Sequence, residues 1–390
     1  MPKVIPINQA WEFVNTAASE ALGRQNVVEE NLTNLVDTGD EIVNANAVDV
    51  YTKSLVLHIG RTVFVDRVYM GSVPSVQRSA VEFGAIVEKV QMDTPQAQEN
   101  ETYSLEDGQT YNQDVFAGPK VSAKFFMKKS TFEVQMSIAE RQVKASFSNA
   151  QQLAAFISMI YTTIEKAMTI RIDELTMRAI NNFAAETVYD DYGANSISSS
   201  SGVKAVNLLY LYNTRYSTSL TAADALTTPA FIRFASYTMK NYIKRLAKAS
   251  SLFNIGGKDR FTPSELLHVV MLSDFEAAAE TFLYDGEGQF RVDGLRLPAA
   301  ETVPYWQGSG TDYAFTSTGK IDVVTADNHD VQVTGVLAVM FDEDALGVTN
   351  YDRRVTTHYN AKAEFINNYY KFDAGYFNDG NENFIVFFAA

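Results

Sequence analysis

Three short stretches gather enough carboxylates to raise the question of metal binding or acid–base catalysis. They are FDEDAL at residues 341–346, DNHD at 327–330 and NDGNEN at 378–383. A calcium loop needs alternating oxygen ligands, a central glycine and a distal bidentate glutamate, and none of the three has that spacing. Neighbouring acids such as Asp342 and Glu343 point to different faces of a strand and do not converge on one cation. The pattern favours the polar ends of strands.

Other motifs of catalytic or cofactor-binding sites are also absent from the sequence. The four histidines are scattered and none forms the pairs of a helical zinc site; they are His58, His268, His329 and His358. His268 begins an apolar strand and is more typical of a satisfied core or edge histidine. NIGGKDRFT lacks the earlier Gly and the following Ser or Thr of a phosphate loop, and YDGEGQFRVDG does not open a helix after a strand as a dinucleotide-binding motif should. No Gly-x-Ser-x-Gly elbow occurs. The absence of cysteine removes thiolate nucleophiles, disulfides and Cys-ligated zinc. The sequence predicts no catalytic, cofactor-binding or metal-binding residue.

Composition limits the classes of function. The chain has 390 residues, a formal net charge of −15 and 46% hydrophobic residues, which predicts a folded protein of two or three domains, or one body with arms. A dedicated nucleic-acid reader is disfavoured by that charge, although the basic run from Lys120 to Lys129 permits weak contact. We find no signal-peptide pattern at the N-terminus and no apolar run of about 18 residues. The expectation is a soluble, cytoplasmic protein.

The first half of the chain predicts an arm and a hairpin. Residues 1 to about 58 mix short amphipathic pieces with polar stretches, which is typical of an arm ordered by its neighbours. Two alternating segments around a long polar tip then predict a projecting β-hairpin. Its outgoing limb and tip are acidic and its returning limb is basic: Glu82, Glu88, Asp93, Glu99, Glu101, Glu106 and Asp107 against Lys120, Lys124, Lys128 and Lys129. Cross-strand pairing within the hairpin, or contact with another subunit in which charge sets the register, explains this equally well.

A long helix follows the hairpin. From Ser148 to about Glu186, apolar residues recur at spacings of three and four, and Ser148 with Gln151, or Asn149 with Gln152, fits a capping box. About 36 residues would extend roughly 54 Å. The irregular heptad register favours a helix lying across a sheet over a coiled coil.

The remainder of the chain mixes helices with strands. Residues from about 203 to 335 predict an α/β domain, with Asp274 as the N-cap of a helix that ends near Gly286. Long strands resume at TGVLAVMF, and NFIVFF is expected to close the chain as a buried strand. The predicted fold class is therefore α+β.

This order of elements resembles the major capsid protein of tailed double-stranded DNA phages, the Hong Kong 97-type coat fold that encapsulin shells also use. The resemblance is strongest in VLAVMFDEDALGVTNYDRRVTTHYNAKAEFINNYYKFDAGYF. It implies the following division: 1–58 N-terminal arm, 59–81 first part of the peripheral domain, 82–146 extended loop, 147–187 spine helix, 188–335 axial domain, 336–375 return strands of the peripheral domain, and 376–390 a closing strand that can rejoin the axial domain. Phe341 would end a peripheral-domain strand, and Asp342 to Asp344 would begin a solvated turn.

The resemblance also implies a function. The chain would be a structural protein, not an enzyme, that self-assembles into pentamers and hexamers of the icosahedral head around a double-stranded DNA genome. Its implied partners are further copies of itself, a separate scaffolding protein, a portal and, weakly and without specificity, the packaged DNA, with no membrane. It would be assembled in the host cytoplasm and located in the virion. The alternatives are an encapsulin-like nanocompartment shell and a carboxylate-metal hydrolase using Asp327, Asp330, Asp342 or Asp344.

Some coats of this fold crosslink a loop lysine to a peripheral-domain asparagine. Lysines and asparagines are present in both regions: Lys120, Lys124, Lys128 and Lys129, and Asn350, Asn360, Asn367 and Asn368. Ordinary surface residues explain them equally well, and no crosslink is predicted.

Overall fold

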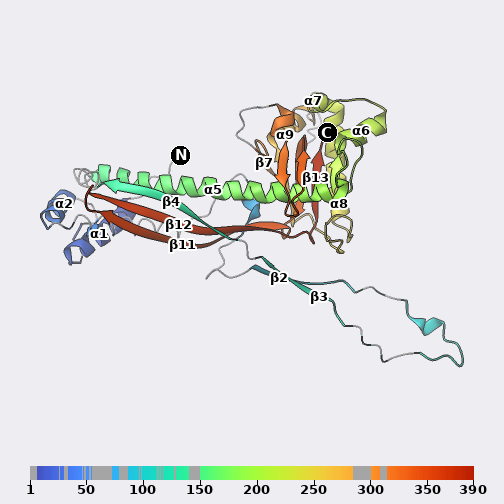
Figure 1. Cartoon of the computed structure of the whole chain (residues 1–390), viewed down its shortest axis with the longest axis horizontal. Coiled ribbons are helices and arrows are strands. Elements are labelled where there is room, and N and C mark those ends of the chain that lie inside the picture. Colours follow the sequence, from blue (N-terminus) through green and yellow to red (C-terminus); the bar gives the residue numbers. More distant parts are fainter. Residues whose placement is uncertain are drawn as a thin grey trace, which may run out of the picture. The chain divides into compact units, whose positions relative to one another are not determined.

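The chain forms two compact units (Figure 1). The first comprises Met1–Gly84, Lys129–Thr176 and Val348–Tyr376, and the second Ala85–Lys128, Met177–Gly347 and Phe377–Ala390. The computed structural model describes residues 7–25, 27–29, 34–45, 47, 50, 51, 54, 73–78, 87–95, 97, 99–111, 114, 116, 118–126, 129–139, 150–283, 300–307 and 314–390. Its helices and separate sheets confirm the predicted α+β class. None of the helices in the described part is both long and apolar enough to cross a membrane.

The first unit is built on a four-stranded sheet. Its order is β1 (Gln77–Arg78), β11 (Leu346–Asn360), β12 (Phe365–Asn378) and β4 (Ser130–Ala139), with β1 parallel to β11 and β4 antiparallel to β12. The rings of Phe132 and Phe372 lie 5.4 Å apart across β4 and β12. The alternating stretch that includes Phe132 was expected in the returning limb of the hairpin. That assignment is wrong, because the stretch pairs with β12 instead.

The long helix is α5 (Ala150–Tyr192), with 43 residues, and it contributes to both units. It is longer than predicted and ends before Gly193, whose φ of 58° suits glycine after a helix. The predicted N-cap residues, Ser148 and Asn149, lie outside the described part of the chain. In the first unit the Arg171 guanidinium lies 4.7 Å from the centre of the Phe132 ring on β4, which confirms that the helix lies against a sheet.

Part of the N-terminal segment is ordered by its own chain. Helices α1 (Ile7–Leu22) and α2 (Leu35–Asn44) occupy it, and a 3-10 turn, η1 (Pro74–Val76), follows. The Trp11 indole donates to the Val28 carbonyl at 2.9 Å, and the Val14 and Ile42 side chains are fully buried. The expectation that this segment depends on neighbours for its order is therefore wrong for these residues.

The second unit surrounds a five-stranded sheet. Its order is β5 (Ala205–Asn207), β13 (Phe384–Phe388), β10 (Val336–Asp342), β6 (Leu267–Leu272) and β7 (Ala300–Val303). Every residue of β10 and β13 is buried. Continuous apolar runs of this kind are typical of strands covered on both faces.

The neighbours of β10 and β13 show which sheet each of these strands belongs to. Strand β10 is antiparallel to both β13 and β6, with Phe341 opposite Phe384 on one side and His268 on the other. Phe341 therefore does not end a strand of the sheet that holds β11 and β12. The closing strand rejoins the sheet of the α/β region, as predicted.

Helices and a small two-stranded sheet complete the second unit: α6 (Leu208–Tyr216), α7 (Ala222–Ala225), α8 (Pro229–Leu246), α9 (Ser273–Leu283), α10 (Phe315–Thr318), β8 (Ile321–Val324) and β9 (Asp330–Val333). Asp274 lies inside the first turn of α9, so its assignment as the N-cap is wrong by position. Its carboxylate accepts a hydrogen bond from Thr318 Oγ1 at 3.1 Å, which ties α9 to α10.

Two glycines with positive φ allow a matched test of close packing in this unit. Gly335 has a φ of 67° and a Cβ built there would lie 2.2 Å from the Ala389 carbonyl oxygen, whereas Gly193 has a φ of 58° and open space around it. We expect Gly193→Ala to cost about 1 kcal/mol of unfolding free energy through backbone strain alone. Gly335→Ala should cost clearly more, since β10 or the C-terminus must move. Urea unfolding of both variants checks this, and equal costs would contradict it.

Candidate functional site

The hairpin in the second unit has two chemically different faces. Strands β2 (Val87–Met92) and β3 (Val121–Phe126) are antiparallel, which confirms the predicted hairpin. Residues directly opposite each other share a face. The register therefore puts Lys89, Gln91, Ser122 and Lys124 on one face, and Glu88, Val90, Met92, Val121, Ala123 and Phe125 on the other.

Lys89 and Lys124 stand directly opposite each other in this register. Like charges directly opposite each other destabilise a strand pair, so these two lysines need acids nearby to compensate their charge. Of the two explanations for the charged limbs, pairing of acids with lysines does not apply to these two lysines, because each faces the other. It does apply just beyond the strand ends, where Asp93 N donates to the Lys120 carbonyl at 2.9 Å and the pKa of Asp93 is lowered by Lys258 and also by Lys120.

The acids that compensate these lysines come from the turn between β12 and β13. Backbone hydrogen bonds hold this turn: Asp379 N donates to the Ala345 carbonyl at 2.7 Å and Gly256 N donates to the Gly380 carbonyl at 2.7 Å. A Cβ on Gly256 would lie 2.1 Å from Asn381 Oδ1, so a larger residue there would displace the Asn381 side chain. The turn therefore presents its acids in fixed positions.

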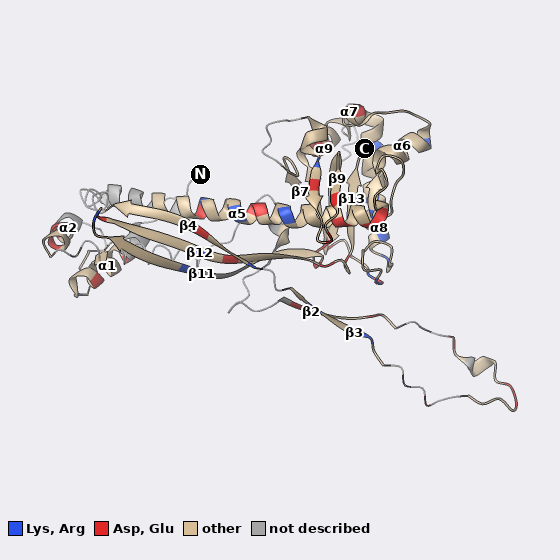
Figure 2. Cartoon of the chain, viewed as in Figure 1, with Lys and Arg blue, Asp and Glu red and all other residues tan. Residues whose placement is uncertain are grey.

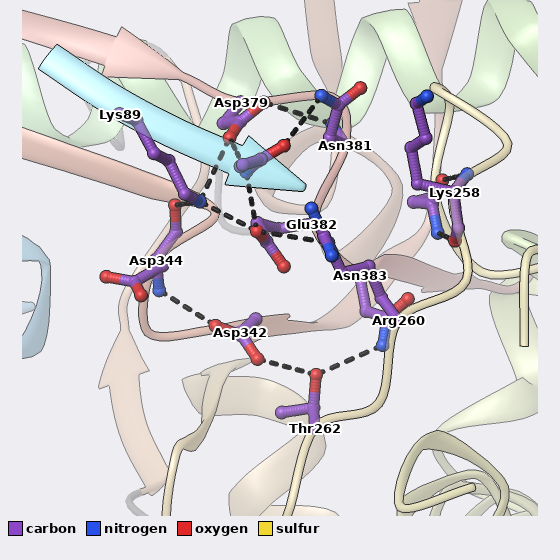
Figure 3. A network of polar contacts seen from close by, with 12 residues as sticks. Lys89, Lys258, Arg260, Thr262, Asp342, Asp344, Asp379, Asn381, Glu382 and Asn383 are labelled. Atoms are coloured by element: carbon purple, nitrogen blue, oxygen red, sulfur yellow. Dashed lines mark hydrogen bonds and ion pairs between the residues drawn. The ribbon is translucent and has the colours of Figure 1, made fainter. Parts of the chain in front are cut away.

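Lys89, Gln91 and Lys124 meet Asp379, Asn381 and Glu382 in a polar network that we term the hairpin clamp. Figure 3 labels Lys89, Asp379, Asn381 and Glu382 of this network. The Asp379 carboxylate, with a fully buried side chain, binds Lys89 Nζ at 2.9 Å and Lys124 Nζ at 2.7 Å. Glu382 Oε1 binds Lys89 Nζ at 2.7 Å. Ionised, hydrogen-bonded pairs of this kind are the strongest polar contacts available to a protein.

Amide groups complete the hydrogen bonding of the clamp. Gln91 Nε2 donates to Asp379 Oδ2 and to Glu382 Oε1, each at 3.0 Å, and Gln91 Oε1 accepts from Asn381 Nδ2 at 2.9 Å. Arg260 Nε lies 3.4 Å from Glu382 Oε1 as an ion pair without hydrogen-bond geometry. A buried charge cluster is stabilising only when its polar atoms are hydrogen-bonded, as the amide groups of Gln91 and Asn381 are here.

Further contacts hold the hairpin near the clamp. Lys258 Nζ binds Asp93 Oδ1 at 2.7 Å just beyond the end of β2. The rings of Phe126 and Phe377 lie 4.9 Å apart at the other end of the strand pair. The clamp, this ion pair and this ring contact fix one face of the hairpin to its own chain.

Burial and charge move the pKa values of the two clamp acids in opposite directions. Burial alone would raise the pKa of Asp379, but hydrogen bonds from Lys124 and Lys89 outweigh it and hold that pKa below its ordinary value of 3.8. At Glu382 burial outweighs Lys89 and raises the pKa above the ordinary 4.5. Asp379 is the anion on which the clamp depends.

These shifts predict a pH dependence with two phases. As the pH falls through the raised pKa of Glu382 towards 4.5, the cost of burying that anion disappears and the second unit gains stability. As the pH falls below 3.8 through the lowered pKa of Asp379, the clamp loses its anion and stability declines. Urea unfolding across this range, with Glu382→Gln as the control, should show the gain only in the unmodified chain. Identical profiles would contradict this assignment.

Asp342, the first of the three acids in FDEDAL, does not lie in a solvated turn. Its side chain is buried, its Oδ2 accepts from Thr262 Oγ1 at 2.6 Å, and its Oδ1 accepts from Asp344 N at 2.9 Å. Asn383 Nδ2 donates to the same Thr262 hydroxyl at 3.1 Å. The expectation of a solvated turn is therefore wrong for Asp342, which ties the end of β10 to neighbouring loops.

The structure does not bring the four candidate metal ligands together. Asp327 and Asp330 are exposed at the turn between β8 and β9, apart from the buried Asp342. In the part of the chain that the structure describes, no group of three or more His, Asp or Glu side chains is placed to hold a metal ion.

The histidines have separate surroundings. His268 is half-buried in the inner strand β6, 5.9 Å from the Phe341 ring, and neither ring nitrogen has a hydrogen-bond partner among the described residues. The position in β6 agrees with the expected core histidine, whereas the expected hydrogen bonds of its ring are not found among the described residues. His329 stacks on Tyr189 at 4.1 Å, His358 is exposed, and His58 lies outside the described residues.

The lysines and asparagines considered for a crosslink differ in their exposure and contacts. Lys124 is held in the clamp, and Lys120 and Lys129 are exposed, whereas Lys128 lies outside the described residues. Asn367 Oδ1 accepts from Ser137 Oγ at 2.6 Å, and Asn368 is fully buried.

Sequence reasoning missed the clamp. It treated NDGNEN as a polar strand end and the lysines as partners for the hairpin or another subunit. The available signal was the strand alternation, which puts Lys124 on the face opposite Phe125. Its partner Asp379 lies 255 residues away. Contacts over that separation depend on strand pairing that the sequence does not specify.

Comparisons with known protein families and with solved structures both find phage capsid proteins. A model described as Phi29-like phage major capsid protein matches residues 14–388. No curated protein matches the chain. The capsid structure of Staphylococcus phage Andhra matches with a TM-score of 0.50 and 10% identity, over 83% of this chain and 86% of that chain. A chain from the bacteriophage P68 structure of head fiber and inner core protein gives 0.49 at 9% identity, over 84% and 87%.

Proposed function

The chain belongs to the Phi29-like phage major capsid protein family, and from this premise we propose how its hairpin, its scaffold and its genome act in assembly. It is a structural protein of the virion that forms the icosahedral phage head, with the Hong Kong 97-type coat fold. The family match selects the phage coat over the encapsulin-like shell and the carboxylate-metal hydrolase.

The observation that carries the proposal is the uncovered apolar face of the hairpin. The exposed fractions are 62% for Val90, 55% for Met92, 59% for Val121 and 55% for Phe125. All four side chains share the face opposite the clamp. Contiguous exposed apolar groups on a soluble chain mark a protein interaction site. This face is therefore covered by a neighbouring copy in the shell, while the clamp keeps the other face on its own chain.

The segment between the two strands adds charge to this contact. Its described acids are Asp93, Glu99, Glu101, Glu106, Asp107 and Asp114. Figure 2 shows acidic residues of the chain in red. Residues 91–119 contain no Lys or Arg. An acidic segment beside an apolar face supports a contact in which burial supplies affinity and charge selects the register. This supports the contact with another subunit that the sequence left open.

Contacts between copies by this face are head-to-tail and close into rings, which we assign to pentamers and hexamers. A separate scaffolding protein sets the size of the shell, a portal occupies one vertex, and the head encloses double-stranded DNA. The proposed division of the chain is arm 1–58, peripheral domain 59–81 and 336–375, extended loop 82–146, spine helix 147–187, axial domain 188–335 and closing strand 376–390, with two revisions. Strand β4, which pairs with β12, is assigned to the peripheral domain, and β10, which pairs with β6 and β13, to the axial domain. Assembly takes place in the host cytoplasm.

The test is electron microscopy of the purified chain, expressed with and without the gene for its scaffold. Hollow icosahedral particles or five- and six-membered rings are expected, with particles of uniform size when the scaffold is present. Particles of the same uniform size without it would contradict the role of a separate scaffold. A monomer or dimer under both conditions would contradict the assembly proposal.

A further inference from the structure

Helix α8 carries a line of cations that the fold itself does not use. On an α-helix, Arg233, Tyr237, Lys240 and Lys244 fall within an arc of about 60° and span about 16 Å along the axis. All four are exposed, Tyr237 to 58%. Lys248 is exposed and follows in the turn after the helix. We term these five residues the α8 stripe.

The sequence around the stripe is unusual in an acidic protein. Residues 225–258 contain no Asp or Glu, although the chain has 47 acids in 390 residues. Within the described residues, no ion pair joins any of the four cations of the stripe to an acid. Elsewhere in the same unit lysines do find acids, as Lys204 does with Asp190 and Asp191 at 2.7 and 3.0 Å.

Helix stability explains only part of this pattern. Lys244 lies in the last turn, where a cation interacts favourably with the helix dipole. Arg233 is the fifth residue of the helix, where the dipole offers a cation no stabilisation. Lys240 and Lys244 are four residues apart, and like charges at that spacing destabilise a helix by a few tenths of a kcal/mol. A partner outside the chain is therefore needed to account for the stripe.

We propose that the α8 stripe binds the phosphate backbone of double-stranded DNA. This rests on the proposed function, in which the head encloses such a genome. A row of point charges without apolar neighbours suits phosphates, which are contacted without base recognition. A protein partner would favour an apolar, charge-depleted centre, and the stripe offers only Tyr237 for that purpose. Binding is weak and independent of base sequence, because the chain as a whole carries −15.

The experiment compares the full-length unassembled chain with a variant in which Arg233, Lys240, Lys244 and Lys248 are all changed to Gln. Binding to a fluorescent 20-base-pair duplex is measured at increasing salt. Each lost phosphate contact removes about 0.9 from the slope of log affinity against log salt. We expect the variant to lose two or more from that slope and at least tenfold in affinity at low salt.

A matched control removes the same charge from other exposed positions and leaves α8 intact. It carries four Gln substitutions, at Arg24, Lys166, Arg178 and Lys362. This control should bind DNA more tightly than the stripe variant and keep most of the original slope. An equal loss in both variants would overturn the proposal, because net charge alone would then explain it.

Two further readouts separate the alternatives. If the stripe receives an acidic protein segment instead, the stripe variant keeps its DNA binding and loses binding of a peptide of residues 91–119, and the proposal is wrong. Shell formation is scored on the same preparations by electron microscopy. Failure of the unmodified chain to form shells would contradict the capsid assembly, whereas the DNA comparison on the unassembled chain is read independently of it.

Discussion

Replacing Asp379 by Asn is expected to lower the free energy of unfolding of the second unit by about 3 kcal/mol. Removing one partner of a buried ion pair costs about 3 to 5 kcal/mol, because the remaining charge stays buried. The lower end applies here, since the Lys89 and Lys124 side chains are 21% and 39% exposed and reach some water. Hydrogen exchange of the β2 and β3 amides measures the effect on the hairpin. A cost of this size corresponds to exchange on the order of 100-fold faster.

Two companion variants show whether the loss comes from the clamp. Asp107→Asn changes an exposed acid between the same two strands and should alter stability by less than about 0.5 kcal/mol. Adding Lys124→Met to Asp379→Asn removes one of the uncompensated cations and should recover part of the stability. Strictly additive costs in the double variant would contradict the ion pair as the source of the effect.

Replacing Phe384 by Ala is expected to lower the unfolding free energy of the same unit by about 3 to 5 kcal/mol, the range for buried aromatic residues. Phe384 is 1% exposed, and its ring lies 4.2 Å from that of Phe183 on α5 and 5.8 Å from that of Phe341 on β10. The variant would leave a cavity between the helix and the sheet. Urea unfolding measures the stability, and the yield of soluble chain should fall with it.

The matched control for Phe384 is Phe261, which is 62% exposed. Phe261→Ala removes the same side chain without opening a cavity and should cost less than about 0.5 kcal/mol. A small loss for Phe384→Ala, similar to that for Phe261→Ala, would show that the sheet tolerates the cavity. The packing of α5 on β13 would then not be a main source of stability.

Local patterns predicted the elements that depend on local interactions. The spacing of apolar residues predicted α5, although its end at Tyr192 lies beyond the predicted one because the buried positions continue through Val188 to Tyr192. Alternation predicted the hairpin of β2 and β3. Both follow from side-chain periodicity within one segment.

Long-range pairing was the part that sequence reasoning could not supply. Strand β4 has the same alternation as β3, and nothing local indicates that it pairs with β12 in a different sheet. In the same way, the apolar sequence of β10 predicts a strand but does not indicate that β6 and β13 are its neighbours. The clamp depends on such pairing, because Lys89 and Glu382 are 293 residues apart. Site residues brought together across strands were therefore not predictable.

The central claim is that one hairpin face binds its own chain and the other face binds a neighbouring copy. Its most direct test is a reconstruction of the assembled shell by electron cryo-microscopy at side-chain resolution. We predict that Lys89 and Lys124 remain on Asp379 and Glu382 of their own chain, while the face with Val90 and Phe125 is buried against a neighbour. An apolar face left in solvent, or lysines paired with acids of another copy, would contradict the account.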